Sequence, residues 1–455
     1  MSRILSSGID GSTGAYLFPE MDLAHFASAT RGQALDQPEP RALQSRFDDR
    51  DLADAGWGII FPEGADPALR ENLSSLIHCR RERATRRDAR RFRELTYLPG
   101  ETKLKFLRRN GSGPGPVDPR KLPFYLLLVG SPEQIPFDLQ YALGVQHAVG
   151  RLCFDDLEAY AGYADSVVSY ETGPSRPARR ATFFAPSHAD DPATGLSTKY
   201  LVEPLLAEVA DASPDWLLDW VVRERATKTH LQELLGGSQT PDLLFTAGHA
   251  VGFGNGNHRQ RPHQGALLCA DWPGPRQWRG RIPPDHYFAA DDVAEKQLGG
   301  LVSFHFACYS AGTPKLDSFP RGGQRRGKAI APEAFVARLP QTLTARGALA
   351  VIGHVDRAWE PSFVWTEKPG DAEPTSQIQV FADALFDIMQ GAPVGLALTH
   401  FGRRYAEIAS ELLFGPSAIP GTDLDDPDQA LLWTACNDAR SYVVAGDPAV
   451  RLRRD

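Results

Sequence analysis

Two short apolar segments that each end on a reactive side chain constrain the fold of this chain most strongly. Residues 301–314 (LVSFHFACYSAGTP) run from an apolar stretch to Cys308 and then into small and turn-forming residues. Residues 242–254 (DLLFTAGHAVGFG) have the same design and lead to His249, 59 positions earlier (308 minus 249). Each pattern predicts a buried β-strand that delivers one side chain to its carboxyl end, where open α/β sheets carry their reactive groups.

A thiol beside an imidazole suits nucleophilic catalysis. A thiol with its usual pKa of roughly 8.5 is only a few per cent thiolate at neutral pH, so a catalytic cysteine needs a nearby base. Small residues surround both side chains, and the backbone amides of Ala250 and Cys308 are placed to form an oxyanion hole. The same spacing also fits an inert buried cysteine and an ordinary loop histidine.

Strand-like and helix-like segments alternate along most of the chain, which predicts a parallel sheet with helices on both faces. The polar, proline-bearing stretch 172–180 is the best candidate for a domain boundary. The expected division is an N-terminal extension (1–50), an α/β subdomain without catalytic residues (51–175) and a catalytic domain (181–455).

The composition excludes several classes of function. A net charge of -8 and a pI near 5.9 argue against a general nucleic-acid-binding protein. Five scattered cysteines indicate a reducing compartment and fit neither a disulfide framework nor a structural zinc site. The chain begins without an apolar signal segment and has no apolar run of membrane-spanning length. We therefore expect a cytoplasmic protein that uses no metal or cofactor and contacts neither nucleic acid nor membrane.

The most basic stretch, residues 80–93, has two interpretations. It is either a solvated helix face with ion pairs to Glu82, Asp88 and Glu94, or a docking surface for an acidic partner.

The segments around His249 and Cys308 resemble a known family. Residues 243–249 (LLFTAGH) and 304–312 (FHFACYSAG) look like the His and Cys blocks of caspase-fold cysteine peptidases, and most closely the gingipain-like branch and its bacterial CHAT-type relatives. Further blocks in the order of that branch are 124–137, 149–171, 347–359 and 441–452. The resemblance covers residues 120–455 and implies a caspase-like parallel-sheet sandwich preceded by a gingipain-like α/β subdomain. The sequence departs from the family at Ala250, where a glycine is usual, and it lacks the short caspase signature around the nucleophile.

The resemblance implies a cysteine endopeptidase that acts on protein or peptide substrates, with Cys308 as nucleophile and His249 as base. In the gingipain-like branch, the loop after the strand at 347–353 lines the pocket for P1, the residue before the scissile bond. Trp359 would form an aromatic wall of this pocket.

Asp356 would then pair with an Arg or Lys side chain of the substrate at P1. Its alternative roles are an ion pair with Arg357 or a turn cap. Asp191 and its neighbour Asp190 are the competing acidic candidates for substrate binding, and the sequence assigns no third member of a catalytic triad.

Residues 320–330 (PRGGQRRGKAI) form a basic, glycine-rich loop after the nucleophile segment. An acidic P1 pocket predicts self-cleavage there after Arg325, Arg326 or Lys328, whereas the alternative is a merely solvated loop. A cytoplasmic protease also requires restraint, which predicts an activator or inhibitor protein as a partner. By analogy with CHAT-type peptidases, a role in bacterial stress, antiviral (antiphage) defence or cell death is expected. Two other functions fit the chain: a catalytically silent caspase-fold scaffold, and a thiol amidase or transpeptidase acting on a non-protein amide.

Overall fold

The computed structural model describes most of the chain. The described residues are 3–5, 7–17, 20–22, 25, 44, 46–174, 179–236, 239–295, 298–319, 327–365, 374–414 and 427–453.

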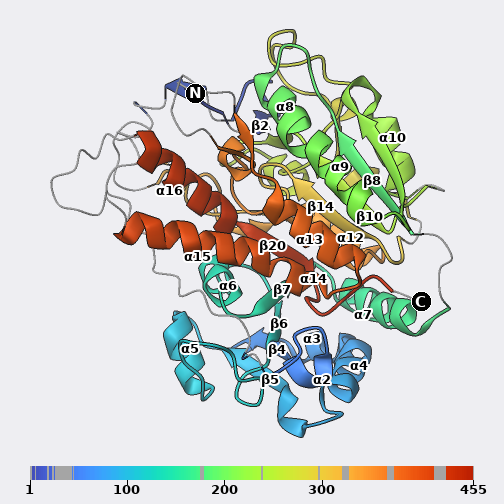
Figure 1. The fold of residues 1–455 in the computed structure, drawn as a ribbon, viewed down its shortest axis with the longest axis vertical. Helices are drawn as coiled ribbons and strands as arrows, with labels where there is room; N and C mark the ends of the chain where they lie inside the picture. Colours follow the sequence, from blue (N-terminus) through green and yellow to red (C-terminus); the bar gives the residue numbers. More distant parts are fainter. Residues whose placement is uncertain are drawn as a thin grey trace.

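One ten-stranded sheet runs through the molecule (Figure 1). Its order is β5 (Phe92–Tyr97), β4 (Trp57–Pro62), β6 (Tyr125–Val129), β7 (Ala148–Leu152), β20 (Tyr442–Gly446), β17 (Ala350–His354), β14 (Val302–Phe306), β10 (Leu243–Ala247), β8 (Arg180–Ala185) and β9 (Leu217–Val222). Every neighbouring pair is parallel except β17 and β20. The central strands are buried on both faces, as near-continuous apolar segments in a parallel sheet require.

Helices cover both faces of the sheet, so the expected α/β class is confirmed. The helices of the first part are α2 (Leu52–Ala55), α3 (Pro67–Asn72), α4 (Ser74–Ala84), α5 (Lys103–Arg109), α6 (Phe137–Gly144) and α7 (Leu157–Thr172). Those of the second part are α8 (Pro192–Ser197), α9 (Glu203–Ala212), α10 (Lys228–Leu234), α11 (Gln260–His263), α12 (Arg338–Ala345), α13 (Gln379–Met389), α14 (Val394–Ala397), α15 (Thr399–Phe414) and α16 (Pro427–Arg440). Apolar residues of α10 and α12 pack on one face of the central strands, and those of α9, α13 and α14 pack on the other.

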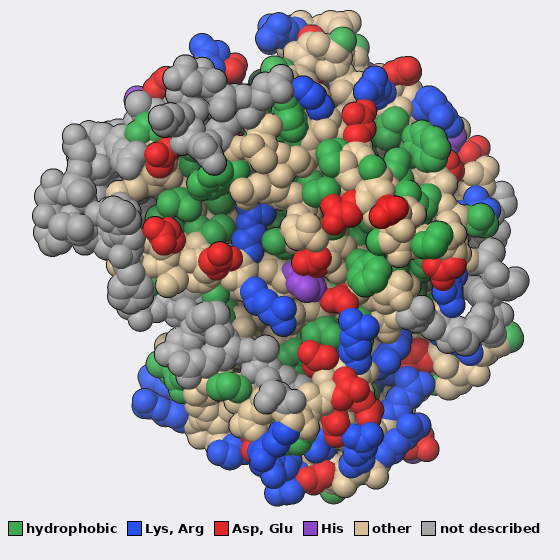
Figure 2. Space-filling view, viewed as in Figure 1, with side chains coloured by type: hydrophobic (Ala, Val, Ile, Leu, Met, Phe, Trp, Pro, Cys, Tyr) green, Lys and Arg blue, Asp and Glu red, His purple; other side chains and the backbone are tan. Residues whose placement is uncertain are grey.

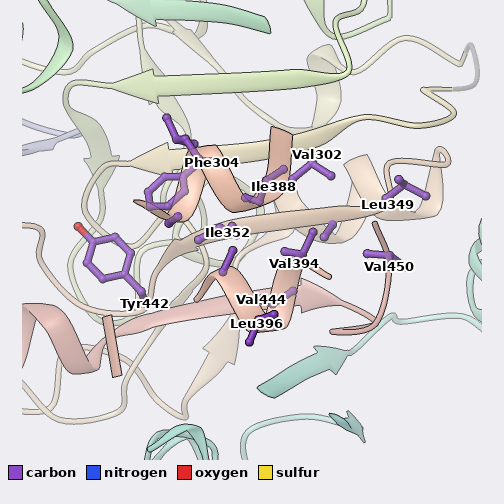
Figure 3. Close-up of a cluster of buried hydrophobic side chains, with 14 of the residues drawn as sticks. Val302, Phe304, Leu349, Ile352, Ile388, Val394, Leu396, Tyr442, Val444 and Val450 are labelled. Carbon is purple, nitrogen blue, oxygen red and sulfur yellow. The ribbon is translucent and has the colours of Figure 1, made fainter. Parts of the chain in front are cut away.

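Figure 3 shows the packing on the second of these faces. Phe304 of β14 and Ile352 of β17 are buried in the same cluster as Ile388 of α13 and Val394 of α14. Successive strand residues point to opposite faces, so Val351 belongs to the cluster on the other side. This packing fixes the position of β14, which leads to Cys308, and that of β17, which leads to Asp356.

The sheet continues across the boundary expected between residues 175 and 181. Strand β7 of the first part pairs in parallel with β20, the last strand of the chain. In addition, the buried Arg80 of α4 forms ion pairs with Glu171 of α7 and with Asp447, which directly follows β20. The two expected domains therefore share one sheet and one buried ion-pair network.

The basic stretch 80–93 lies in the lower part of the view, where Arg, Lys, Asp and Glu side chains intermingle (Figure 2). Arg81 pairs with Glu94 and Arg90 pairs with Asp88. Two of the three expected acidic partners are thus in place, which favours a solvated face with ion pairs.

A small second sheet joins the start of the chain to the region after His249. Its order is β13 (Tyr287–Phe288), β12 (Leu267–Leu268), β11 (Ala250–Gly252) and β2 (Gly8–Asp10). Strands β1 (Arg3–Ile4) and β3 (Met21–Asp22) pair beside it. The described part of the expected extension 1–50 is therefore built into the body. No helix within the described ranges combines the length and the apolar character needed to cross a membrane.

Candidate active site

The ends of β10 and β14 lie side by side and bring His249 and Cys308 to the same edge of the sheet. The two strands are parallel neighbours, with Ala247 paired with Phe306. The Gly248 amide donates to the Phe306 carbonyl at 3.1 Å, so the pairing continues past the ends of the strands. His249 lies two residues after Ala247, and Cys308 lies two residues after Phe306. The two apolar strands predicted from the sequence therefore place the thiol and the imidazole at equivalent positions at the ends of neighbouring strands.

A tight turn holds Cys308 at the end of β14. The next residue, Tyr309, has φ +58°, a left-handed conformation that is uncommon for a non-glycine residue. Its amide donates to the Asp356 carbonyl at 2.8 Å. The Ser310 hydroxyl donates to the His305 carbonyl and accepts from the His354 amide, both at 3.0 Å. The turn is thereby fixed both to its own strand and to the loop after β17.

A buried carboxylate orients the imidazole of His249. The Nε2 atom of His249 lies 2.8 Å from Oδ2 of Asp191, and neither side chain is exposed. Asp191 also accepts hydrogen bonds from the hydroxyls of Thr194 and Tyr16. Burial alone would raise the pKa of Asp191, but the charge and hydrogen bond of His249, with those two hydroxyls, hold it below its usual value.

The contact with Asp191 favours the His249 tautomer that a general base needs. When Nε2 donates its proton to Asp191, Nδ1 is the acceptor nitrogen of the neutral ring. Nδ1 is buried and has no hydrogen-bond partner among the described residues. The ring is also packed edge-on against Tyr16 and Trp272, with centroid distances of 5.6 and 6.2 Å. Aromatic packing and the Asp191 contact together fix the ring orientation.

The start of the chain covers both reactive side chains. Cys308 is 0% and His249 is 1% exposed. Strand β2 pairs with β11 immediately after His249, in a register that sets Gly8 opposite Ala250. The amide of Cys308 donates to the Ser7 carbonyl at 3.4 Å. The two amides predicted to form an oxyanion hole, those of Ala250 and Cys308, therefore both lie beside this segment.

The residues predicted to bind substrate occupy three different settings. Asp191 contacts His249, which points to an orienting role that the sequence analysis did not assign. Asp356 is buried, accepts from the Arg357 amide at 2.8 Å and lies 3.5 Å from the Arg357 guanidinium. Arg357 itself forms a bidentate pair with Asp317. This setting favours the two alternatives weighed for Asp356, the ion pair and the turn cap.

Trp359 is fully buried in an apolar cluster with Phe319, Leu431 and Trp433. Met21 of β3 packs against the same cluster. Trp359 is therefore covered by other side chains, including one from the N-terminal region, and its expected role as a wall of the P1 pocket stays a prediction.

Glu360 is a functional candidate that the sequence analysis did not single out. Its side chain is only 5% exposed, and neither carboxylate oxygen has a hydrogen-bond partner among the described residues. Burial raises the pKa of Glu360 to about 8. It lies two residues after Ala358, whose carbonyl accepts from the Ser7 amide at 3.2 Å. No sequence signal marks Glu360, because only the fold reveals that its buried carboxylate lacks a hydrogen-bond partner among the described residues.

Of the predicted self-cleavage loop, residues 327–330 are among the described residues. Arg325 and Arg326 lie outside the described residues. Lys328 is exposed, and its carbonyl accepts from the Asp317 amide at 2.8 Å. Within the described residues, no group of three or more His, Cys, Asp or Glu side chains is arranged to hold a metal ion.

Comparison with known proteins finds similarity only among solved structures. No protein-family model matches the sequence, and no curated protein matches it. The Arg-specific cysteine proteinase gingipain R is similar with a TM-score of 0.49 and 13% identity, over 88% of this chain and 78% of that chain. A second structure, described as a protease, has a TM-score of 0.49 and 12% identity, over 89% and 80% of the two chains.

The separase–securin complex of Saccharomyces cerevisiae is also similar, with a TM-score of 0.33 and 13% identity over 71% of this chain and 16% of that chain. Because all of these TM-scores lie below 0.5, the chemistry proposed below is argued from this chain's own residues.

Proposed function

We propose that this chain is a cysteine endopeptidase in which Cys308 is the nucleophile and His249 the general base. The observation that carries the proposal is the parallel register of β10 and β14, which sets both residues at one sheet edge. The second support is Asp191, which holds His249 Nε2 at 2.8 Å and leaves Nδ1 as the basic nitrogen. A buried thiol that served only as a small apolar side chain would require none of this arrangement.

The reaction follows from these positions. His249 takes the proton of Cys308, and the thiolate attacks the scissile carbonyl carbon to form a tetrahedral intermediate. The amides of Ala250 and Cys308 stabilise the oxyanion. His249 then gives its proton to the leaving amine, and water hydrolyses the thioester with His249 again acting as base. Asp191 stabilises the imidazolium that forms in both stages.

We further propose that the enzyme cleaves after a basic residue, with Glu360 as the acidic group of the P1 pocket. A buried carboxylate without a hydrogen-bond partner is costly, and a guanidinium or ammonium group from a substrate would provide a partner of opposite charge. Glu360 is joined by two peptide bonds to Ala358, whose carbonyl already accepts a backbone amide beside the nucleophile. Asp356 is less suited because Arg357 and Asp317 surround it.

A positional peptide library tests this proposal. Gly8→Phe, a variant in which the site is expected to be uncovered, should cleave after Arg or Lys, and the wild type should do so more slowly. Adding Cys308→Ala should reduce the rate by about a thousandfold or more. The matched control is Cys436→Ala, which removes another buried thiol that lies in α16, and which should keep the activity.

Glu360→Gln should selectively reduce cleavage after Arg and Lys relative to other P1 residues. Cleavage that survives Cys308→Ala would overturn the proposed nucleophile. Turnover of a non-protein amide without any peptide cleavage would instead identify a thiol amidase or transpeptidase.

A further inference from the structure

The N-terminal segment 7–17 lies directly on the nucleophile. Strand β2 pairs in parallel with β11, setting Gly8 opposite Ala250, and the Gly11 amide donates to the Gly252 carbonyl at 2.8 Å. A Cβ atom at position 8 would lie 2.9 Å from Cys308 Sγ, closer than such atoms approach one another. Only glycine therefore fits at position 8 with the segment in this place.

The backbone of Ser7 makes the contacts expected of a substrate residue before a scissile bond. Its amide donates to the Ala358 carbonyl at 3.2 Å, and its carbonyl accepts from the Cys308 amide at 3.4 Å. Because the Gly11 amide donates to the Gly252 carbonyl, the alternation of the parallel ladder points the Ala250 amide toward the Ser7 carbonyl. The Ser7 carbonyl thus occupies the position proposed for the oxyanion, and Ser7–Gly8 lies where a substrate would be cut.

The chain after this bond is held in place by further contacts. It turns back on itself, with the Asp10 amide donating to Ala15 and the Leu17 amide donating to Gly8, both at 2.8 Å. Ile9 is fully buried in a cluster with side chains of β11 and β12, and the Tyr16 hydroxyl donates to Asp191. If Cys308 attacked the Ser7 carbonyl, the Gly8 amine would remain beside the thioester and would compete with water for it, which slows any net cleavage.

The side chain at position 7 also fails to match the proposed pocket. Serine carries no positive charge, so among the described residues the carboxylate of Glu360 stays without a hydrogen-bond partner while this segment is bound. A basic side chain at the same backbone position would supply a partner of opposite charge. The segment therefore has the backbone of a substrate without the side chain that the pocket is proposed to select.

We propose that residues 7–17 occupy the substrate-binding cleft of their own chain as a built-in pseudosubstrate, with Ser7–Gly8 at the scissile position. The enzyme is latent until this segment leaves, and an incoming substrate then follows the same path along β11. This inference rests on the proposed peptidase function, because a pseudosubstrate requires a cleft that binds peptide substrates. The physical occlusion of Cys308 can nevertheless be measured without any turnover.

The first experiment measures alkylation of Cys308 in the full chain by iodoacetamide, followed by peptide mass mapping. The wild type should react slowly. Gly8→Phe forces a side chain against Cys308 Sγ, and Ser7→Pro removes the amide that donates to Ala358, so each should displace the segment. Each variant should increase the Cys308 alkylation rate about tenfold or more. Cys269 and Cys436, both buried elsewhere, report in the same sample whether the fold is intact.

The outcomes separate this inference from the proposed function. Equal alkylation of Cys308 in the wild type and in folded variants would overturn the pseudosubstrate. Faster alkylation without hydrolysis of any peptide would support the occluding segment and count against the peptidase. Equal peptide hydrolysis by the wild type and both variants would support the peptidase and count against latency.

A second experiment converts the segment into a substrate. In Ser7→Arg, the new guanidinium meets Glu360, so Cys308 forms a thioester with the residue 7 carbonyl, His249 protonates the Gly8 amine, and water releases residues 1–7. Intact mass should show a chain that begins at Gly8, whereas Ser7→Leu, similarly large and uncharged, should stay whole. An uncut Ser7→Arg chain that cleaves peptides after Arg would overturn the placement of the Ser7–Gly8 bond.

Discussion

Individual side chains decide the chemistry of the candidate site through contacts between distant parts of the sequence. Asp191 and His249 are 58 positions apart, and Tyr16 reaches the same carboxylate across 175 positions. Glu360 is exceptional in the opposite sense, because the fold buries it without a hydrogen-bond partner among the described residues. Two predictions at this scale follow from these two carboxylates.

Replacing Asp191 with Asn should lower kcat by about a hundredfold or more, with a smaller effect on KM. The amide removes the negative charge that stabilises the imidazolium and no longer selects the ring tautomer that makes Nδ1 basic. Steady-state kinetics over a range of pH would check this, because an orienting role also shifts the pH profile. The control is Asp190→Asn, since Asp190 accepts from the Arg276 amide and does not contact His249. Equal losses in both variants would contradict the role of Asp191.

Replacing Glu360 with Gln should change how stability depends on pH. Burial raises the pKa of Glu360 to about 8 from a value of 4.5 in the unfolded chain. Between these values the folded state holds a proton that the unfolded state has lost, so this group lowers stability as pH rises. Urea unfolding between pH 5 and about 8 should therefore show Glu360→Gln gaining stability relative to the wild type. The exposed Glu158→Gln should show no such trend.

The element that matters most is the turn after β14. It places Cys308 and is fixed to the loop after β17 by the Ser310 hydroxyl, which bonds to one backbone group on each side. The strand itself was predictable from its apolar pattern, because buried parallel strands read as continuous apolar runs. The partner of the turn was not, since the order of strands in a sheet depends on how the intervening helices pack.

Replacing Ser310 with Ala should destabilise the protein by about 1–3 kcal/mol, because two buried backbone groups each lose a hydrogen bond. Activity should also fall, since the position of Cys308 depends on this turn. The matched control is Ser75→Ala, which removes a largely exposed hydrogen bond to Asp165 and should cost less than about 0.5 kcal/mol. Chemical denaturation of both variants would check the difference, and similar values would contradict the role of the turn.

At the scale of the whole molecule, one continuous sheet joins the two parts of the chain that the sequence pattern assigns to separate domains. The expected boundary between 175 and 181 falls between α7 and β8, yet β7 and β20 pair across the two parts. Arg80 strengthens the same junction, because it is 1% exposed and contacts both Glu171 and Asp447. We expect the two parts to unfold together.

Replacing Arg80 with Met should cost about 3–5 kcal/mol, because the buried Asp447 loses its ion-pair partner and the buried Glu171 keeps only the one with Arg83. The neighbouring Arg81→Met removes a pair that is largely exposed and should cost less than about 1 kcal/mol. Thermal unfolding followed by near- and far-UV circular dichroism would check both values and the single transition. Two separate transitions in the wild type would contradict the shared sheet.

The strands that carry Cys308 and His249 and the α/β class follow from the sequence alone. These features depend on local apolar periodicity, which is written in consecutive residues. The fold was needed to show that Asp191 contacts His249, that the buried Glu360 carboxylate has no hydrogen-bond partner among the described residues, and that Ser7–Gly8 lies on the nucleophile. These contacts join residues far apart in the chain, so they depend on strand order and close packing, which no local pattern encodes.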